Sequence, residues 1–282
     1  MTRSLALIRQ AVMPELVVRH LDVPSPRASR ALHGLRIAHV SDLHLSRWTP
    51  MVEELQRLLI ARPADFVAVT GDFCRVPRDY RRAAALTTRL LAPVAARRPV
   101  YAVLGNHDHE CLRDALAPVL TMLPDRSTVH RTHGGRIRIG GVEQLRPGAG
   151  DIQAALADDD DLPTVLLAHY PSTVYALAGR RVDIQLSGHT HGGQVRLPRL
   201  GCIWSNDRLP ARCAWGLTRV GRTALHVSAG IGVSPPIRIR WNCPPEVTFL
   251  RIVPPESTAA AHDGTGDVEN PNRRVDPRRR SA

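Results

Sequence analysis

The chain has 282 residues, 43% of them hydrophobic and 23% charged, so it is long enough for a large core and has the composition of a globular protein. This composition excludes a small disulfide-stabilised scaffold, a wholly disordered chain and a protein with many membrane spans. The formal net charge is +12, and all 38 basic residues are Arg. Such a surface favours phosphorylated or other anionic partners, although an ordinary solvated basic surface explains the charge equally well.

Residues 1–34 are expected to form an N-terminal extension. Its apolar stretch, Leu5–Val18, is interrupted by charged residues and a proline, and it is shorter than the roughly 20 residues that a membrane span needs. No secretory hydrophobic region precedes a cleavage site. The 5 cysteines lack CxxC spacing, which favours a reducing compartment over a disulfide framework. We therefore expect a cytoplasmic location, with peripheral contact at the inner membrane as the alternative.

From Leu35 onward, short apolar runs alternate with amphipathic segments, which is typical of a layered α/β protein. Buried strands are predicted at Leu35–Val40, Asp65–Thr70, Pro99–Leu104, Thr164–Ala168 and Asp183–Ser187. Apolar residues at three- and four-residue spacing predict helices at Val52–Ala61 and Arg78–Ala96. Further strands, in a second sheet, are predicted at Arg131–Val142, Gln194–Pro198, Thr223–Ser228 and Glu246–Val253.

The composition changes after Pro255, where the chain becomes rich in Ser, Ala, Asp, Asn and Arg. Such a segment has too little apolar surface to offset the entropy of ordering. The sequence therefore predicts one domain over residues 35–255, followed by a disordered basic tail over residues 256–282.

Each of the five predicted buried strands ends in residues that could bind a metal ion. These endings are Asp42-Leu43-His44, Gly71-Asp72, Gly105-Asn106-His107-Asp108, His169 and Gly188-His189-Thr190-His191. Taken alone, each is more often a turn or a hydrogen-bonded core residue. Because strands of an open α/β sheet place ligands at their carboxyl edge, the five endings together predict one metal site. Imidazole and carboxylate ligands suit Zn, Fe or Mn.

The ordered set DLH, GDF, GNHD, an isolated His and GHTH resembles the calcineurin-like metallophosphoesterase superfamily over Leu35–Pro198. The stretch Val227–Leu250 is similar to its bacterial YkuE/YaeI-like branch. This resemblance implies a four-layer α/β/β/α sandwich and two divalent metal ions. One ion would be held by Asp42, His44, Asp72 and His191. The other would be held by Asp72, Asn106, His169 and His189, so that Asp72 bridges the pair.

The reaction implied is metal-dependent hydrolysis of a phosphodiester. Two ions roughly 3.5–4 Å apart would hold a hydroxide that attacks phosphorus in line. His107 is expected to protonate the leaving group or stabilise the transition state, with Asp108 orienting it. Arg47 and Arg75 are candidates for clamping a substrate phosphate. An alternative substrate is the pyrophosphate of a lipid-linked nucleotide, such as UDP-2,3-diacylglucosamine, at a membrane surface.

Two other classes of protein compete with an enzyme. The +12 charge and the Arg-rich tail suit a nucleic-acid-binding protein, but only 4% of residues are aromatic and no RRM, KH or zinc-finger signature is present. Specific nucleic-acid binding is therefore not expected. A catalytically inactive scaffold is disfavoured by the complete ligand set.

Overall fold

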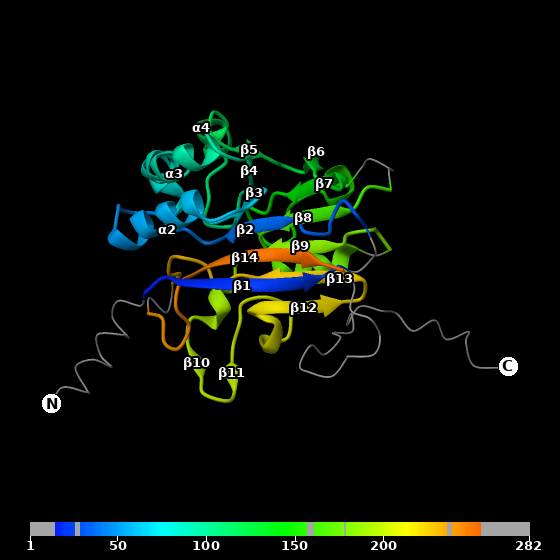
Figure 1. Cartoon of the computed structure of the whole chain (residues 1–282). Helices are drawn as coiled ribbons and strands as arrows, with labels where there is room; N and C mark the ends of the chain where they lie inside the picture. The colour runs from blue at the N-terminus through cyan, green and yellow to red at the C-terminus, as the bar shows by residue number, and fades with distance from the viewer. Residues whose placement is uncertain (1–14, 26–28, 157–160, 178, 236–238, 255–282) are drawn as a thin grey trace.

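Two six-stranded β-sheets lie at the centre of the molecule (Figure 1). The computed structural model describes residues 15–25, 29–156, 161–177, 179–235 and 239–254, so the predicted basic tail lies outside the described residues. The first sheet has the order β1 (Val17–Pro24), β14 (Glu246–Val253), β2 (Arg36–Val40), β3 (Phe66–Thr70), β4 (Val100–Val103) and β5 (Thr121–Met122). The second has the order β12 (Gly216–Val220), β13 (Thr223–Val227), β9 (Ile184–Ser187), β8 (Thr164–Ala168), β7 (Gly135–Val142) and β6 (Arg126–Thr132).

The five predicted buried strands are all confirmed, as β2, β3, β4, β8 and β9. In the first sheet β3 pairs parallel with β2 and with β4, and in the second sheet β8 pairs parallel with β9. All five residues of β3 and of β8 are buried, as expected for parallel strands that are covered on both faces. The strand ends that carry the predicted ligands come from two sheets and not from one open sheet.

Helices cover the outer face of the first sheet. The predicted amphipathic helices are confirmed as α2 (Pro50–Ala61) and α3 (Tyr80–Ala95), and a short helix, α4 (Leu112–Leu116), follows. The Thr49 hydroxyl caps α2 by accepting a hydrogen bond from the Val52 amide at 3.3 Å. Buried side chains of α2 and α3, such as Leu55 and Leu90, pack in one apolar cluster with Val67 and Val69 of β3.

A second apolar cluster joins the two sheets face to face. It contains Ile37 and Phe66 from the first sheet and Ile139, Val165 and Leu186 from the second, all fully buried. The outer face of the second sheet is covered by α5 (Ile152–Ala155) and by 3-10 turns at Pro171–Leu177 and Ala211–Cys213. The layers are therefore helix, sheet, sheet and helix, as predicted.

Two strands differ from the prediction. Glu246–Val253 was predicted for the second sheet, but as β14 it pairs antiparallel with β2 in the first sheet. Val17–Pro24, in the predicted N-terminal extension, forms the edge strand β1 and pairs with β14 along its whole length. Edge strands alternate weakly between buried and exposed residues, and β1 carries Arg19, His20 and Asp22. Its local pattern therefore did not indicate a strand.

The remaining predicted strands form hairpins. Arg131–Val142 contains the turn between β6 and β7, which pair antiparallel. Gln194–Pro198 contains β10 (Arg196–Leu197), which pairs with β11 (Gly201–Cys202) in a small separate hairpin. Within the described residues, no helix is long and apolar enough to cross a membrane. The five cysteines, all within the described residues, are free.

Candidate metal centre

The carboxyl ends of β2, β3, β4, β8 and β9 bring the predicted ligands together. Asp42 and His44 follow β2, Asp72 follows β3 and Asn106 follows β4. His169 follows β8, and His189 and His191 follow β9. Backbone bonds hold these loops against one another, since the Asp42 amide donates to the Gly71 carbonyl at 3.0 Å and the His44 amide to the Asp72 carbonyl at 2.9 Å. The site thus lies where the ends of the two sheets meet.

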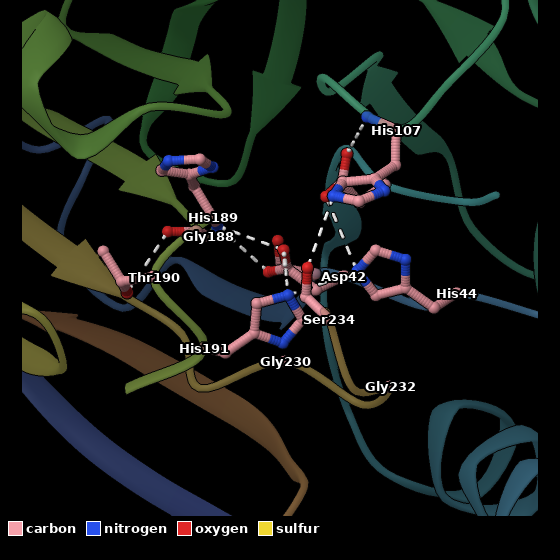
Figure 2. A network of polar contacts seen from close by, with 12 residues as sticks. Asp42, His44, His107, Gly188, His189, Thr190, His191, Gly230, Gly232 and Ser234 are labelled. Carbon is pink, nitrogen blue, oxygen red and sulfur yellow. Dashed lines mark hydrogen bonds and ion pairs between the residues drawn. The ribbon is translucent and has the colours of Figure 1, made fainter. Parts of the chain in front are cut away.

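Four residues form the first group of candidate ligands: Asp42, His44, Asp72 and His191. One ligand atom from each lies within 4.8 Å of the others, and all four residues are buried. His191 Nε2 lies 3.3 Å from Asp42 Oδ1, and His44 Nε2 lies 3.5 Å from Asp72 Oδ2. Figure 2 shows the His191 ring directed towards Asp42, with His44 close by. Two carboxylates and two imidazoles in this arrangement can surround a single cation.

A second group lies on the other side of Asp72. Asn106 Oδ1 lies 3.0 Å from His169 Nε2 and 3.0 Å from His189 Nδ1. His169 Nε2 lies 3.5 Å from Asp72 Oδ1, the oxygen opposite the one that faces His44. The two oxygens of Asp72 therefore face different groups of candidate ligands.

Hydrogen bonds to backbone carbonyls orient two of the histidines. His44 Nδ1 donates to the Cys74 carbonyl at 2.7 Å, and His169 Nδ1 donates to the Thr70 carbonyl at 2.8 Å. Each bond occupies Nδ1, so that Nε2 is the ring nitrogen that faces the site. This outer support is what a metal-binding histidine usually has.

The chemistry of these side chains fits divalent metal ions. Asp42 and Asp72 are almost completely buried, and burial of a carboxylate without a cation is costly. Burial raises the pKa of Asp42 to about 6, despite the opposing charges of His169 and Arg240. Carboxylate, imidazole and amide oxygen donors suit Mn, Fe or Zn, and the donor set does not distinguish among them.

The backbone at the candidate ligands is strained. Asp42, His44, Asp72, His189 and His191 all have positive φ, between 44° and 69°. Non-glycine residues adopt this left-handed region rarely, and such strain concentrates at functional sites. Packing of the two sheet ends holds these five residues in a conformation that points their side chains to a common centre.

Residues 228–234, which follow β13, cover the first group of candidate ligands, and we call them the covering segment. The sequence pattern did not assign them this role. The Ile231 amide donates to the Ser41 carbonyl at 3.1 Å, and the Gly232 amide donates to the Asp42 carbonyl at 2.7 Å. A Cβ atom at Gly232 would lie 2.5 Å from the His44 Cβ, so only glycine allows this approach. Glycine here therefore lets the segment close directly over the ligands.

Arg240 holds this covering segment in place. Its side chain is buried, and its guanidinium donates to the carbonyls of Ala229 at 2.6 Å, Gly230 at 3.2 Å and Cys243 at 3.2 Å. Its Nη2 also lies 3.4 Å from His191 Nδ1. Nothing in the local sequence distinguished Arg240 from the other arginines of the chain, because its partners are distant carbonyls.

His107 lies beside the candidate ligands. Its amide donates to Asp72 Oδ1 at 2.9 Å, and its Nδ1 donates to the Arg75 carbonyl at 3.1 Å. Its Nε2 lies 3.3 Å from the Ser234 hydroxyl, on the covering segment (Figure 2). The ring is therefore fixed at Nδ1, and Nε2 is directed towards the site.

Asp108 differs from the expectation that it orients His107. Its two oxygens accept hydrogen bonds from the amides of Cys74, at 2.8 Å, and Gly105, at 3.0 Å. Through these two amides the carboxylate joins the loops after β3 and β4. The side chain of Arg47 is exposed, and Arg75 contacts His107 through its backbone carbonyl. Contact between either guanidinium and a substrate phosphate stays a prediction.

The pKa values of the histidines differ sharply. Burial lowers the pKa of His44 to about 4 and that of His189 to about 3, and it also lowers the pKa of His191. Burial also acts to lower the pKa of His169, but the charge of Asp72 and a hydrogen bond with it outweigh burial and raise this pKa to about 9. At neutral pH, three of the imidazoles are therefore neutral, whereas His169 is protonated.

Metal binding is expected to release about one proton per chain at neutral pH, because His169 must lose its Nε2 proton before that nitrogen can bind a cation. The measurement is isothermal titration of Mn²⁺ into the protein in buffers of different ionisation enthalpy, where the slope of apparent enthalpy gives the protons released. The variant His169→Gln should lose this release while still binding metal at the first group. A slope of zero for the unaltered chain would contradict the prediction.

Comparisons with known proteins agree with this geometry. The family model for calcineurin-like phosphoesterases matches residues 35–193, which include every candidate ligand. The chain is 30% identical to the phosphodiesterase YaeI of Escherichia coli, covering 77% of this chain and 82% of YaeI. It is 30% identical to the metallophosphoesterase YkuE of Bacillus subtilis, covering 78% of this chain and 79% of YkuE.

A third relative is named for a different substrate. The chain is 27% identical to the UDP-2,3-diacylglucosamine pyrophosphatase LpxG of Chlamydia muridarum, covering 84% of this chain and 89% of LpxG. All three similarities extend over most of both chains, and therefore beyond the residues that carry the candidate ligands.

Proposed function

Since the chain belongs to the calcineurin-like phosphoesterase family, and is a hydrolase of phosphoester bonds, we propose that it hydrolyses phosphodiesters at a centre of two divalent metal ions. Asp42, His44, Asp72 and His191 would hold one ion, and Asp72, Asn106, His169 and His189 the other. The observation that carries this proposal is the position of Asp72, whose oxygens face His44 at 3.5 Å and His169 at 3.5 Å. A carboxylate can share its oxygens between two cations, whereas an imidazole nitrogen has one lone pair.

The residues of the chain would bind and orient an anionic substrate. When bound, two divalent ions supply Lewis-acid polarisation of the phosphoryl oxygens and activation of a water nucleophile. Asp42 and Asp72 contribute two negative charges, fewer than the positive charges of two divalent ions, so the loaded site attracts phosphate. The buried ligands and the covering segment would limit the approach of solvent to a phosphorus bound there.

His107 is proposed as the proton donor to the leaving group. Because Nδ1 is held by the Arg75 carbonyl, Nε2 is the nitrogen that can carry a proton into the site. Ser234 Oγ, 3.3 Å from Nε2, would hold the ring in this direction. Arg47 and Arg75 are proposed, as before, to contact a substrate phosphate.

Replacing His107 with Gln is expected to lower kcat for a diester with a poor leaving group by roughly 100-fold, in line with the usual contribution of general acid–base catalysis. A p-nitrophenolate leaving group needs little protonation, so the loss should be much smaller for bis-p-nitrophenyl phosphate. The measurement is kcat for both diesters with the unaltered and variant proteins. An equal loss for both leaving groups would contradict proton donation by His107.

The similarity to YaeI, whose name is phosphodiesterase, supports a diester substrate. The alternative is the pyrophosphate bond of a lipid-linked nucleotide, supported by the similarity to LpxG, which is named for that reaction. This alternative requires peripheral contact between a cytoplasmic enzyme and the inner membrane. Both substrates present a phosphoryl group linked to two substituents, so one metal centre can serve either.

The test is hydrolysis of three substrates by the full chain loaded with Mn²⁺, Fe²⁺ or Zn²⁺. These are bis-p-nitrophenyl phosphate, p-nitrophenyl phosphate and UDP-2,3-diacylglucosamine in detergent micelles. The proposal predicts that the diester is cleaved faster than the monoester and that chelation abolishes cleavage. Preference for the lipid-linked nucleotide would favour the alternative, whereas faster cleavage of the monoester would overturn both.

A further inference from the structure

Exposed apolar side chains gather on one projecting part of the molecule. Among the described residues, the large hydrophobic side chains that are exposed, apart from Val17 and Val129, are Leu200, Ile203, Trp204, Ile239 and Trp241. We call these five residues the hairpin surface. The exposed fraction is 72% for Leu200 and 62% for both Ile203 and Trp204, so the described residues leave most of each side chain uncovered. Isolated exposed residues are common, but such a cluster marks an interaction site.

The hairpin surface is held together by backbone pairing. Strand β10 pairs with β11 on one side, and the segment of Trp241 lies along its other side. The Arg196 amide donates to the Trp241 carbonyl at 3.0 Å, and the Trp241 amide donates to the Gln194 carbonyl at 2.9 Å. Figure 1 shows this hairpin extending away from the two sheets, beyond β12. The apolar side chains are therefore carried on an ordered, projecting element.

The base of the hairpin is anchored to the main domain. The guanidinium of Arg196 lies over the Trp215 ring, 4.5 Å from its centroid, and Arg19 of β1 lies over the same ring at 4.2 Å. Arg196 Nη1 also donates to the Gly192 carbonyl at 3.2 Å. The base of the hairpin is thus in contact with β1, through Trp215, and with the turn that carries His191.

The two segments that carry the hairpin surface contain charges of one sign only. From His189 to Asn206 and from Val227 to Pro245, the sequence contains no Asp or Glu, and every fully charged residue is Arg. Arg199, at the turn between β10 and β11, is exposed. Apolar and aromatic side chains beside cationic ones match the boundary between the headgroups and the acyl chains of an anionic bilayer. A protein partner would need a complementary acidic groove, and nothing in these residues selects one.

The hairpin surface is continuous with the candidate metal centre. The 3-10 turn His191–Gly193 leads directly into β10, so a candidate ligand and the hairpin belong to one short segment. After β11 the chain returns to the site, where the Asn206 carbonyl lies 3.4 Å from His189 Nε2. Binding of the hairpin to a surface would therefore hold the metal centre close to that surface.

We propose that the hairpin surface docks the protein onto anionic lipid bilayers, with Leu200, Ile203 and Trp204 entering the headgroup region and arginines contacting lipid phosphates. This inference rests on the alternative proposed above, in which the substrate is linked to a lipid, but docking itself does not depend on which bond is hydrolysed. Docking in this way would place the hairpin side of the enzyme against the lipid. It would bring phosphates attached to lipids within reach of the candidate metal ligands at the base of the hairpin.

The test is co-sedimentation of the full chain with vesicles of phosphatidylcholine, with and without phosphatidylglycerol. The unaltered chain should bind the anionic vesicles, and high salt should weaken binding because it screens the arginines. Leu200→Ser/Trp204→Ser should lower the vesicle partition coefficient at least about tenfold, since two apolar side chains would no longer be buried. Val129→Ser, which alters an exposed apolar residue on β6, is the matched control and should bind like the unaltered chain.

Three results would overturn the proposal: no binding of the unaltered chain to anionic vesicles, equal binding of the hairpin variant, or an equal loss in Val129→Ser. A dimer that the hairpin variant converts to monomers, with vesicle binding retained, would instead assign the surface to contacts between two copies of this chain.

Thermal unfolding of the variants is compared first, and Ile203→Ser replaces the double variant if the double variant is unfolded. Hydrolysis of a soluble diester by the same samples separates failure of docking from failure of the proposed activity.

Discussion

Replacing Asp72 with Asn lowers phosphodiester hydrolysis by roughly a thousandfold or more, equivalent to about 4 kcal/mol of transition-state stabilisation. The amide keeps the size of the carboxylate but loses the negative charge that both groups of candidate ligands face. Asp72 Oδ1 also accepts the His107 amide hydrogen bond at 2.9 Å, so the variant weakens the position of the proposed proton donor as well. The measurement is kcat/KM for bis-p-nitrophenyl phosphate at saturating Mn²⁺.

The control for this variant is Asp114→Asn, which neutralises an exposed carboxylate on α4. It should retain the activity of the unaltered chain, because its charge is screened by solvent. Metal content is measured for both proteins, and Asp72→Asn should hold less than the unaltered chain. Full activity of Asp72→Asn would rule out the bridging role.

Replacing Arg240 with Met lowers the free energy of unfolding by about 3–5 kcal/mol, because the buried carbonyls that its guanidinium satisfies lose their donors. These carbonyls belong to the segment that covers Asp42 and His44, so the variant also loses hydrolytic activity at temperatures where it remains folded. The measurements are urea-induced unfolding, followed by circular dichroism, and kcat/KM for bis-p-nitrophenyl phosphate.

Arg251→Met is the matched control for Arg240→Met. Arg251 forms an exposed ion pair with Asp22, and such pairs contribute about 0–1 kcal/mol. Arg240→Lys retains the charge but not the planar set of donors, so it should recover only part of the stability. If Arg240→Met were as stable as Arg251→Met, the carbonyls around Arg240 would not depend on its guanidinium.

The strands that carry the site were predictable because their residues are apolar on both faces. Runs such as Phe66–Thr70 and Thr164–Ala168 are buried throughout, and their polar endings form a specific ordered set. The helices were predictable from periodic apolar residues, and α2 also has Thr49 as its cap. In both cases the information lies within one element, so the local sequence is sufficient.

The pairing of strands was less predictable. The sequence of Glu246–Val253 indicates a buried strand, but the choice between β2 and a strand of the second sheet depends on contacts across more than 200 residues of sequence. The edge strand β1 carries polar residues that obscured its pattern. Local sequence therefore indicated where the strands lie, and not which neighbour each strand pairs with.

The candidate site divides in the same way. The structure brings together the seven predicted ligands, each of which follows a predicted strand. The contributions of Arg240 and Gly232 were missed, because a buried arginine and a close glycine are defined by the distant atoms that they meet. The carboxylate of Asp108 was assigned to His107 from adjacency in sequence, whereas its partners are the amides of Cys74 and Gly105.

The most direct test of two metal ions sharing Asp72 is a titration of the chelated protein with Mn²⁺ in which bound metal and diester hydrolysis are measured on the same samples. We predict two ions per chain, spin coupling between them in the electron paramagnetic resonance spectrum, and full activity only when both are bound. Full activity with a single bound ion, or two bound ions without diester hydrolysis, would contradict the proposed centre.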